Sequence, residues 1–370
     1  MNTKTTSHHP FFGLLTFIAL IFTLYILKSL IIPILYAIIL AVMIFPVQRF
    51  LEHRWRFNRL FATLCSLFII FFISVLIGTL VYFQLNSIKN NGEDYTKNIS
   101  ELYNDVTTSL QDTFNIDSSN TLFSSDLKIE NIIKGNFDKI GQLVTQSGSL
   151  ISNIVLIPIY LFFFLYYRRF FRVFYYKLFR YKSKTFLNTI IGKIYNIQQN
   201  YLIGLVKVIL IVGILNTIGL LILGIDHALF FGFFAAILLI IPYVGVIIGS
   251  LIPAVFALAT QDNPWIAFGV VAIFMFIQFL EGNFITPKIT GSQVSINAFI
   301  AIVSLIVFSM LWGIAGMIVA LPVTATLKII FDHTPGYHAY GFLIGDPIDK
   351  HLHGRARTRL KNWKKIKSAN

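Results

Sequence analysis

The sequence has few charged residues and almost no cysteine. Asp, Glu, Lys and Arg together make up 12% of the 370 residues, about half of the share that soluble proteins carry. A single cysteine excludes a disulfide framework and any metal site built on cysteines. Hydrophobic residues account for 56% of the chain, which includes 37 phenylalanines. With so few charges to cover it, much of this surface is expected to face lipid.

Long uncharged runs predict where the chain crosses the bilayer. A helix needs about 20 apolar residues to cross a hydrocarbon core roughly 30 Å thick. Such runs predict an all-α integral membrane protein with about eight hydrophobic segments. These segments are 11–27, 29–47, 60–88, 140–167, 208–225, 228–261, 263–280 and 289–327. No small-residue cleavage site follows the first run, so we interpret it as an anchor rather than a signal peptide.

Basic residues gather in four places that one topology puts in the cytoplasm. They precede the first run, follow the second and the fourth, and fill the tail after residue 350. The segment 89–139, in contrast, has more acidic than basic residues. By the positive-inside rule, this segment is extracytoplasmic and both termini are cytoplasmic.

The net charge of +14 does not indicate a nucleic-acid-binding protein. The basic clusters flank apolar spans, where anionic lipids are the expected partner, and no basic soluble module is present. The tail at 350–367 suits either a helix lying on the headgroups or a disordered basic tail.

The extracytoplasmic insert at 89–139 has apolar residues at three- and four-residue steps, which predicts two amphipathic helices. A cap or an oligomer contact is one interpretation; we favour a solvated hairpin. The resulting division is 1–88 (three spans), 89–139 (insert), 140–200 (fourth span and basic segment), 201–332 (transport core) and 333–370 (basic tail).

Two of the apolar runs are too long for one straight crossing. As straight helices, 228–261 and 289–327 would measure about 51 and 58 Å at 1.5 Å per residue. Glycines and prolines interrupt both runs, and they should break or fold back there. The interrupting residues are Pro242, Gly245, Gly249 and Pro253 in the first run, and Gly313, Gly316 and Pro322 in the second. Each run either crosses once with kinks or forms a re-entrant hairpin, and we favour hairpins.

Interrupted apolar segments are typical of transporter sites, because irregular backbone at membrane depth has to line a cavity or be covered by protein. The other interpretation is a passive bundle of long kinked helices.

Between the two broken runs lies Glu281, the only acid from residue 263 to residue 331. An ionisable group beside an apolar run is a functional candidate. Gln278 and Asn283 are close enough in sequence to share a polar pocket with it. Alternatively, Glu281 pairs with Lys288 at the membrane surface.

The chain has no motif of a known catalytic centre. HExxH, GxSxG and the Walker A motif are all missing, so we expect no enzyme activity, no cofactor and no metal site. Active transport would have to use an ion gradient or the gradient of the solute.

Three segments together, 240–258, 278–291 and 311–330, resemble the autoinducer-2 exporter family of bacterial membrane proteins. The resemblance implies an inner-membrane exporter of a small polar solute that forms a homo-oligomer, with a pentamer expected. Some members look like sodium/proton antiporters, so the family leaves the substrate open. The residues implied in binding or gating are Pro242, Tyr243, Gly245, Gln278, Glu281, Asn283, Pro287, Lys288, Gly313, Gly316 and Pro322.

The sequence therefore predicts a secondary transporter that exports a small polar solute by alternating access. One alternative is a cation/proton antiporter that uses Glu281 with H⁺ or Na⁺ as the coupling ion. Another is a non-transporting scaffold whose 89–139 insert binds an envelope partner.

Overall fold

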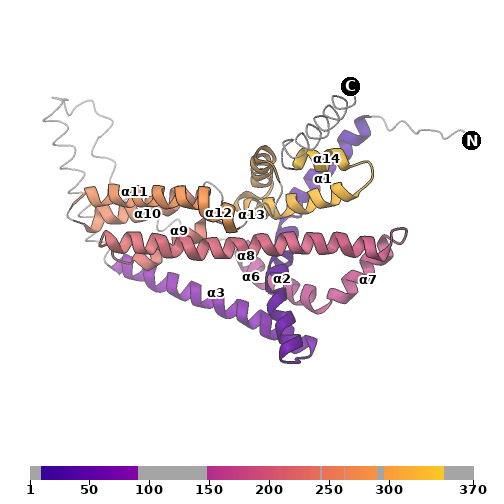
Figure 1. Cartoon of the computed structure of the whole chain (residues 1–370), viewed down its shortest axis with the longest axis horizontal. Helices are drawn as coiled ribbons and strands as arrows, with labels where there is room; N and C mark the ends of the chain where they lie inside the picture. The colour runs from indigo at the N-terminus through magenta and orange to yellow at the C-terminus, as the bar shows by residue number, and fades with distance from the viewer. Residues whose placement is uncertain (1–9, 91–147, 242–243, 262, 290–295, 346–370) are drawn as a thin grey trace, which may run out of the picture. The chain divides into compact units, whose positions relative to one another are not determined.

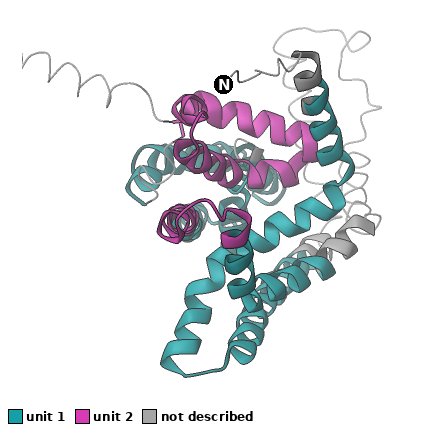
Figure 2. Cartoon of the chain, turned by 90° about the vertical axis from the view of Figure 1, so that its right-hand side faces the viewer, with its two compact units in different colours: residues 1–175, 202–291 teal, residues 176–201, 292–370 magenta. Residues whose placement is uncertain are grey.

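The computed structural model describes residues 10–90, 148–241, 244–261, 263–289 and 296–345, and this part of the chain is helical without a strand (Figure 1). Five of its helices are long and apolar enough to cross a membrane. The prediction of an all-α integral membrane protein is confirmed. The chain forms two compact units, residues 1–175 with 202–291 and residues 176–201 with 292–370 (Figure 2).

The first unit begins with helices that match the predicted spans. They are α1 (Pro10–Ile26), α2 (Lys28–Arg54), α3 (Arg59–Asn90) and α6 (Gly148–Tyr166). Helices α2, α3 and α6 pack on one another, with Ala37 and Ile44 of α2 buried against Leu161 and Leu165 of α6. The start of the predicted fourth span and nearly all of the 89–139 insert lie outside the described residues, as does the tail from residue 346.

A buried polar group joins α2 to its neighbours. The Gln48 amide is fully buried and donates to Thr63 Oγ1 of α3 (2.9 Å) and to Glu52 Oε1 (3.2 Å). Glu52 also pairs with Arg168 at the start of α7 (Arg168–Leu178). These bonds connect α2 to α3 and to the start of α7, although Gln48 Oε1 and Arg168 Nη1 are buried without a partner among the described residues.

Helix α8 (Lys184–Ile222) is 39 residues long and belongs to both units. It is much longer than the predicted span 208–225. Lys193 and Lys207 interrupt the apolar run without breaking the helix, because lysine is a good helix former and no proline occurs between residues 159 and 241. The apolar run 208–225 therefore predicts only the part of α8 that can face lipid.

The first broken run is a helical hairpin. Helix α9 (Ala228–Leu238) has 11 residues and covers only about 16 Å, too short to cross a bilayer. Helix α10 (Val244–Thr260) packs against α9, and Figure 1 shows α11 (Trp265–Leu280) beside α10. The hairpin that the run length favours is therefore present. Pro242 and Tyr243, at the turn, lie outside the described residues.

The second broken run turns sharply at Gly313. Helix α13 (Ala298–His333) contains Gly313 with φ 62° and ψ −142°, a conformation that is almost restricted to glycine. Beyond it, a methyl group added at Gly316 would lie 1.9 Å from the Phe308 carbonyl oxygen. In a straight helix, these residues would be about 12 Å apart. The two halves of α13 are therefore folded against each other at the break.

Pro322, in contrast, does not interrupt α13. It lies buried in the second half of the helix, and its carbonyl oxygen accepts a hydrogen bond from Gln198 Nε2 of α8 (2.5 Å). Gln198 Nε2 also donates to Thr326 Oγ1 (2.8 Å). The break predicted for this run is located at Gly313 and Gly316 alone, because proline removes one N–H but keeps a helical φ.

Asn297 holds the beginning of α13. Its Oδ1 accepts from the backbone N–H of Ile300 (2.9 Å), as an N-cap does. Its Nδ2 donates to the carbonyl oxygens of Leu343 (2.6 Å) and Gly345 (2.8 Å), at the end of α14 (His338–Ile344). The Asn297 side chain thus connects the N-terminus of α13 to the last turn of α14.

Candidate functional site

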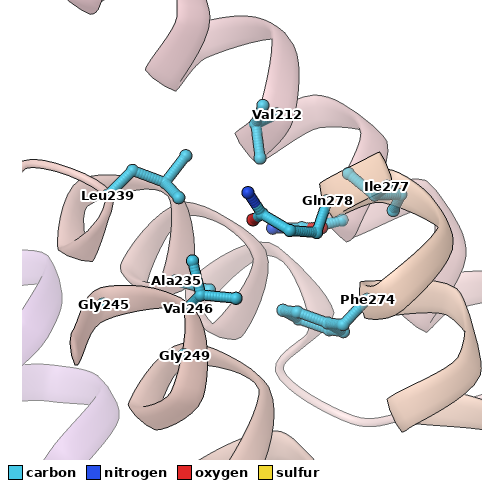
Figure 3. Close-up of a pocket in the computed structure, with 10 residues that line it drawn as sticks. Val212, Ala235, Leu239, Gly245, Val246, Gly249, Phe274, Ile277 and Gln278 are labelled. Atoms are coloured by element: carbon cyan, nitrogen blue, oxygen red, sulfur yellow. The ribbon is translucent and has the colours of Figure 1, made fainter. Parts of the chain in front are cut away.

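A pocket lies in the first unit where the α9–α10 hairpin meets α8 and α11 (Figure 3). The described residues that line it are Val212, Asn216, Ala235, Leu239, Gly245, Val246, Gly249, Phe274, Ile277 and Gln278. Figure 3 shows the Gln278 side chain extending into the space between Val212, Leu239 and Phe274. The broken run thus provides one wall of the pocket and an unbroken span provides another.

Two predicted glycines bring the backbones of the hairpin together at this pocket. A methyl group on Gly245 would lie 1.8 Å from the Leu238 carbonyl oxygen, and one on Gly249 would lie 2.9 Å from the Cβ of Ala235. Both glycines are therefore required for close approach within the hairpin. Pro253, also predicted, is buried in α10 and is not among the described residues of the lining.

The volume of the pocket is about 20 Å³. A cavity needs about 10–15 Å³ to hold one water molecule, and drug-sized ligands occupy pockets of about 300–1,000 Å³. The pocket therefore has room for about one water molecule in this conformation, and it would have to widen to take a solute.

Asn216 is the most deeply buried polar residue of the lining, and it was not predicted from the sequence. It lies on α8 with 3% of its surface exposed, and its amide has no hydrogen-bond partner among the described residues. A polar pair, Asn216 and Thr217, in the middle of the apolar run 208–225 was the available signal. Thr217 satisfies its hydroxyl within α8 by donating to Gly213 O (2.7 Å), whereas Asn216 faces the pocket.

Glu281 forms a hydrogen bond with Gln278, a residue of the pocket lining. It begins η1 (Glu281–Ile285), a π-helical turn between α11 and α12 (Thr286–Ile289). Gln278 Nε2 donates to Glu281 Oε2 (2.7 Å) and Thr286 Oγ1 donates to Glu281 Oε1. Single π-helical turns often occur at functional sites.

The alternative pairing of Glu281 with Lys288 is not present among the described residues. In an α-helix, residues seven apart lie on nearly the same face, which made this pair plausible. The π-helical turn changes which residues share a face, since its hydrogen bonds join residues five apart. Thr286, five residues on, replaces Lys288 as the partner, and Lys288 and Pro287 are exposed.

Asn283 does not share the polar pocket with Gln278. Its Nδ2 donates to the carbonyl oxygen of Phe279 (2.9 Å) one turn earlier, and its side chain is exposed. Because a local backbone acceptor is available, the Asn283 amide is satisfied on the surface of its own helix.

The remaining predicted residues, Gly313, Gly316 and Pro322, belong to the second unit. Gly313 and Gly316 lie at the sharp turn of α13, and Pro322 accepts the hydrogen bond from Gln198. Over the described ranges, no group of three or more His, Cys, Asp or Glu side chains could hold a metal ion.

The fold and the pocket define a multi-pass helical membrane protein with a small, mostly apolar pocket that contains two amides, beside a broken helix. The profile of the AI-2E family transporters matches residues 14–336, so the chain belongs to the AI-2E transporter family. It is 30% identical over 315 residues to "Putative transport protein YueF" of Bacillus subtilis, covering 82% of this chain and 84% of that protein.

Two further relatives match a shorter part of the chain. "Putative transport protein YrrI" of Bacillus subtilis is 32% identical over 36% of this chain and 37% of its own length. "AI-2 transport protein TqsA" of Escherichia coli is 26% identical over 40% of this chain and 43% of its own length. The names of these relatives describe transport, which supports the class of function that the sequence predicts.

Proposed function

We propose that this protein is a secondary transporter that moves a small polar solute through the pocket between α8, the α9–α10 hairpin and α11. The observation that carries the proposal is Asn216, which is buried in a pocket with Gln278 beside a broken run and whose amide has no partner among the described residues. Buried amides normally have partners, so a solute that supplies them would be bound here. Rearrangement of the hairpin would then expose the pocket to each side of the membrane in turn.

The name of TqsA makes AI-2 the first solute to test, and export across the bacterial inner membrane is the direction we propose. The sodium/proton antiporter remains a second candidate. It is favoured by one observation, the half-buried Glu281 carboxylate within the candidate span Trp265–Ile289.

Inside-out vesicles that contain the protein should accumulate AI-2 faster than vesicles without it. Gln278→Leu should reduce the uptake to background, because the mutation removes the polar group in the pocket. Phe268→Leu is the matched control, because Phe268 lies on the same helix with an exposed side chain. Imposed proton or sodium gradients would identify the coupling ion. Sodium-driven proton flux without AI-2 uptake would instead establish the antiporter.

We also propose that anionic lipids and further copies of the chain are its partners in the membrane. Helix α7 has a basic face with Arg169 and Arg172 and an apolar face with Phe170 and Phe174, and none of its residues is buried. Such a helix suits the surface of the cytoplasmic leaflet. A homo-oligomer, with a pentamer implied by the family resemblance, is the proposed assembly.

Cysteine labelling in intact cells tests the proposed topology. In a Cys65→Ser background, Ser118→Cys in the 89–139 insert should react with a membrane-impermeant thiol reagent added outside. Ser368→Cys in the tail should react only after the cells are opened. The opposite pattern would show that the positive-inside rule fails for this chain.

A further inference from the structure

We infer that the α2–α3 turn and the start of α7 form a binding site for the phosphate group of an anionic phospholipid, with Arg59, Arg168 and Arg169 as its cations. The inference rests on the partnership with anionic lipids proposed above, and it adds the residues and the chemical group that are recognised. It is independent of the pocket, of the transported solute and of the direction of transport.

Two contacts join parts of the chain that lie 116 and 107 residues apart in the sequence. Arg168, at the start of α7, pairs with Glu52 near the end of α2. Arg59, the first residue of α3, donates from Nη1 to the backbone carbonyl oxygen of Tyr166, the last residue of α6 (3.5 Å). The ends of α2, α3, α6 and α7 therefore meet at one place, and both turns supply arginines to it.

The positive charge at this place exceeds the negative charge. Arg59 lies within electrostatic range of Arg168, Arg169 and Glu52. The segments that form these four helices contain no other acid, and Glu52 is already paired with Arg168. Three guanidinium groups against one carboxylate leave two positive charges, which repel each other unless an anion lies between them.

The protein does not use all the hydrogen-bond donors of these arginines. Arg59 Nε and Arg168 Nη1 are buried without a partner among the described residues. The Arg168 side chain is still 24% exposed, and Arg169 is exposed as a whole. A guanidinium has five N–H donors in a planar fork, which matches the oxygens of a phosphate group. Both the excess charge and the spare donors therefore point to a phosphate anion.

Aromatic side chains beside the arginines indicate that the phosphate belongs to a lipid. Phe50, Trp55, Phe57 and Phe61 form a row in which neighbouring ring centroids are 5.6–6.4 Å apart. Trp55 and Phe61 are each 59% exposed. Water disfavours such a patch, whereas tryptophan and arginine are typical of the boundary between headgroups and acyl chains. A free phosphate ion has no apolar part to contact this row, and a phospholipid has one.

Native mass spectrometry of the purified full-length protein in an uncharged detergent tests the inference without any solute. Phosphatidylglycerol should bind about 10-fold more tightly than phosphatidylcholine with the same acyl chains, because only its headgroup has a net negative charge. Arg169→Gln should lose about 10-fold in affinity for phosphatidylglycerol, the change expected for one charge-assisted hydrogen bond. Arg180→Gln removes the same charge from an exposed arginine that follows α7, and it should bind the lipid as the unmodified protein does.

Arg169 is exposed, so its replacement should leave the melting temperature unchanged. Three results would overturn the inference: equal affinity for the two lipids, equal affinity of Arg169→Gln and Arg180→Gln, or displacement of phosphatidylglycerol by millimolar inorganic phosphate, which would make the occupant a free ion. If Arg172→Gln weakens binding and Arg169→Gln does not, this site fails while the partnership of α7 with anionic lipids remains. Uptake of AI-2 is measured separately, so a failure of the transport proposal leaves the lipid result as it stands.

Discussion

Alanine at Gly245 should abolish transport, even though it adds a single methyl group. That methyl group would lie 1.8 Å from the carbonyl oxygen of Leu238 and 2.3 Å from its carbonyl carbon, both of them backbone atoms. The hairpin therefore has to open, at a cost of about 1–3 kcal/mol or more. Because Gly245 lines the pocket, the opening changes the site directly. Uptake into inside-out vesicles and the melting temperature of the purified protein would measure both effects.

Gly78→Ala is the matched control, since a methyl group there has nothing within 4 Å in the described structure. It should leave uptake unchanged and should not lower the melting temperature, because alanine is the better helix former. Normal uptake by Gly245→Ala would contradict the close approach of α9 and α10. Loss of all folded protein would assign this glycine to packing of the fold rather than to the pocket.

Glu281→Gln should weaken transport about 10- to 100-fold. The substitution keeps the shape of the side chain but removes the charge that orients Gln278. Hydrogen bonds to charged groups contribute about 1.5–3 kcal/mol, and about 1.4 kcal/mol corresponds to a factor of ten. The loss should appear mainly in the KM for the solute, because the orientation of the Gln278 amide determines binding. The melting temperature should change little.

Lys288→Met is the companion variant. Lys288 is exposed and has no partner among the described residues, so its loss should change uptake less than 2-fold. A Lys288 variant as damaged as Glu281→Gln would restore the ion pair as the functional unit. An unchanged KM in Glu281→Gln would remove Glu281 from the solute site and leave the antiporter hypothesis without its carboxylate.

The existence of the helices could be predicted from hydrophobicity, but their ends could not. The runs 11–27, 29–47 and 60–88 correspond to α1, α2 and α3, whereas the run 208–225 shows less than half of α8. An apolar run shows which part of a helix can face lipid, and it does not show where the helix begins or ends. Lysines such as Lys193 end a run without ending the helix, so the N-terminal part of α8 has no hydrophobic signature.

Of the polar and glycine residues that line the pocket, Gly245, Gly249 and Gln278 were predicted from the sequence and Asn216 was not. Gly245 and Gly249 stand out because glycines interrupt an apolar run, and both line the pocket. Asn216 lies in an uninterrupted helix, and only its three-dimensional surroundings show that its amide faces the pocket without a partner among the described residues. Lys288 was a plausible partner for Glu281 only if the segment between them were a regular α-helix. No local sequence signal revealed the π-helical turn.

The hydrogen bonds of Asn297 connect the beginning of α13 to the end of α14. Asn297 precedes the first residue of α13 and bonds to Leu343 and Gly345 at the far end of α14, while Gln198 holds the second half of α13 through Pro322 and Thr326. A segment tied at its two ends and near its middle should open cooperatively rather than fray. Amide hydrogens on both sides of Gly313 should therefore exchange with solvent at one common rate. If this segment moves during a transport cycle, it should move as a rigid body.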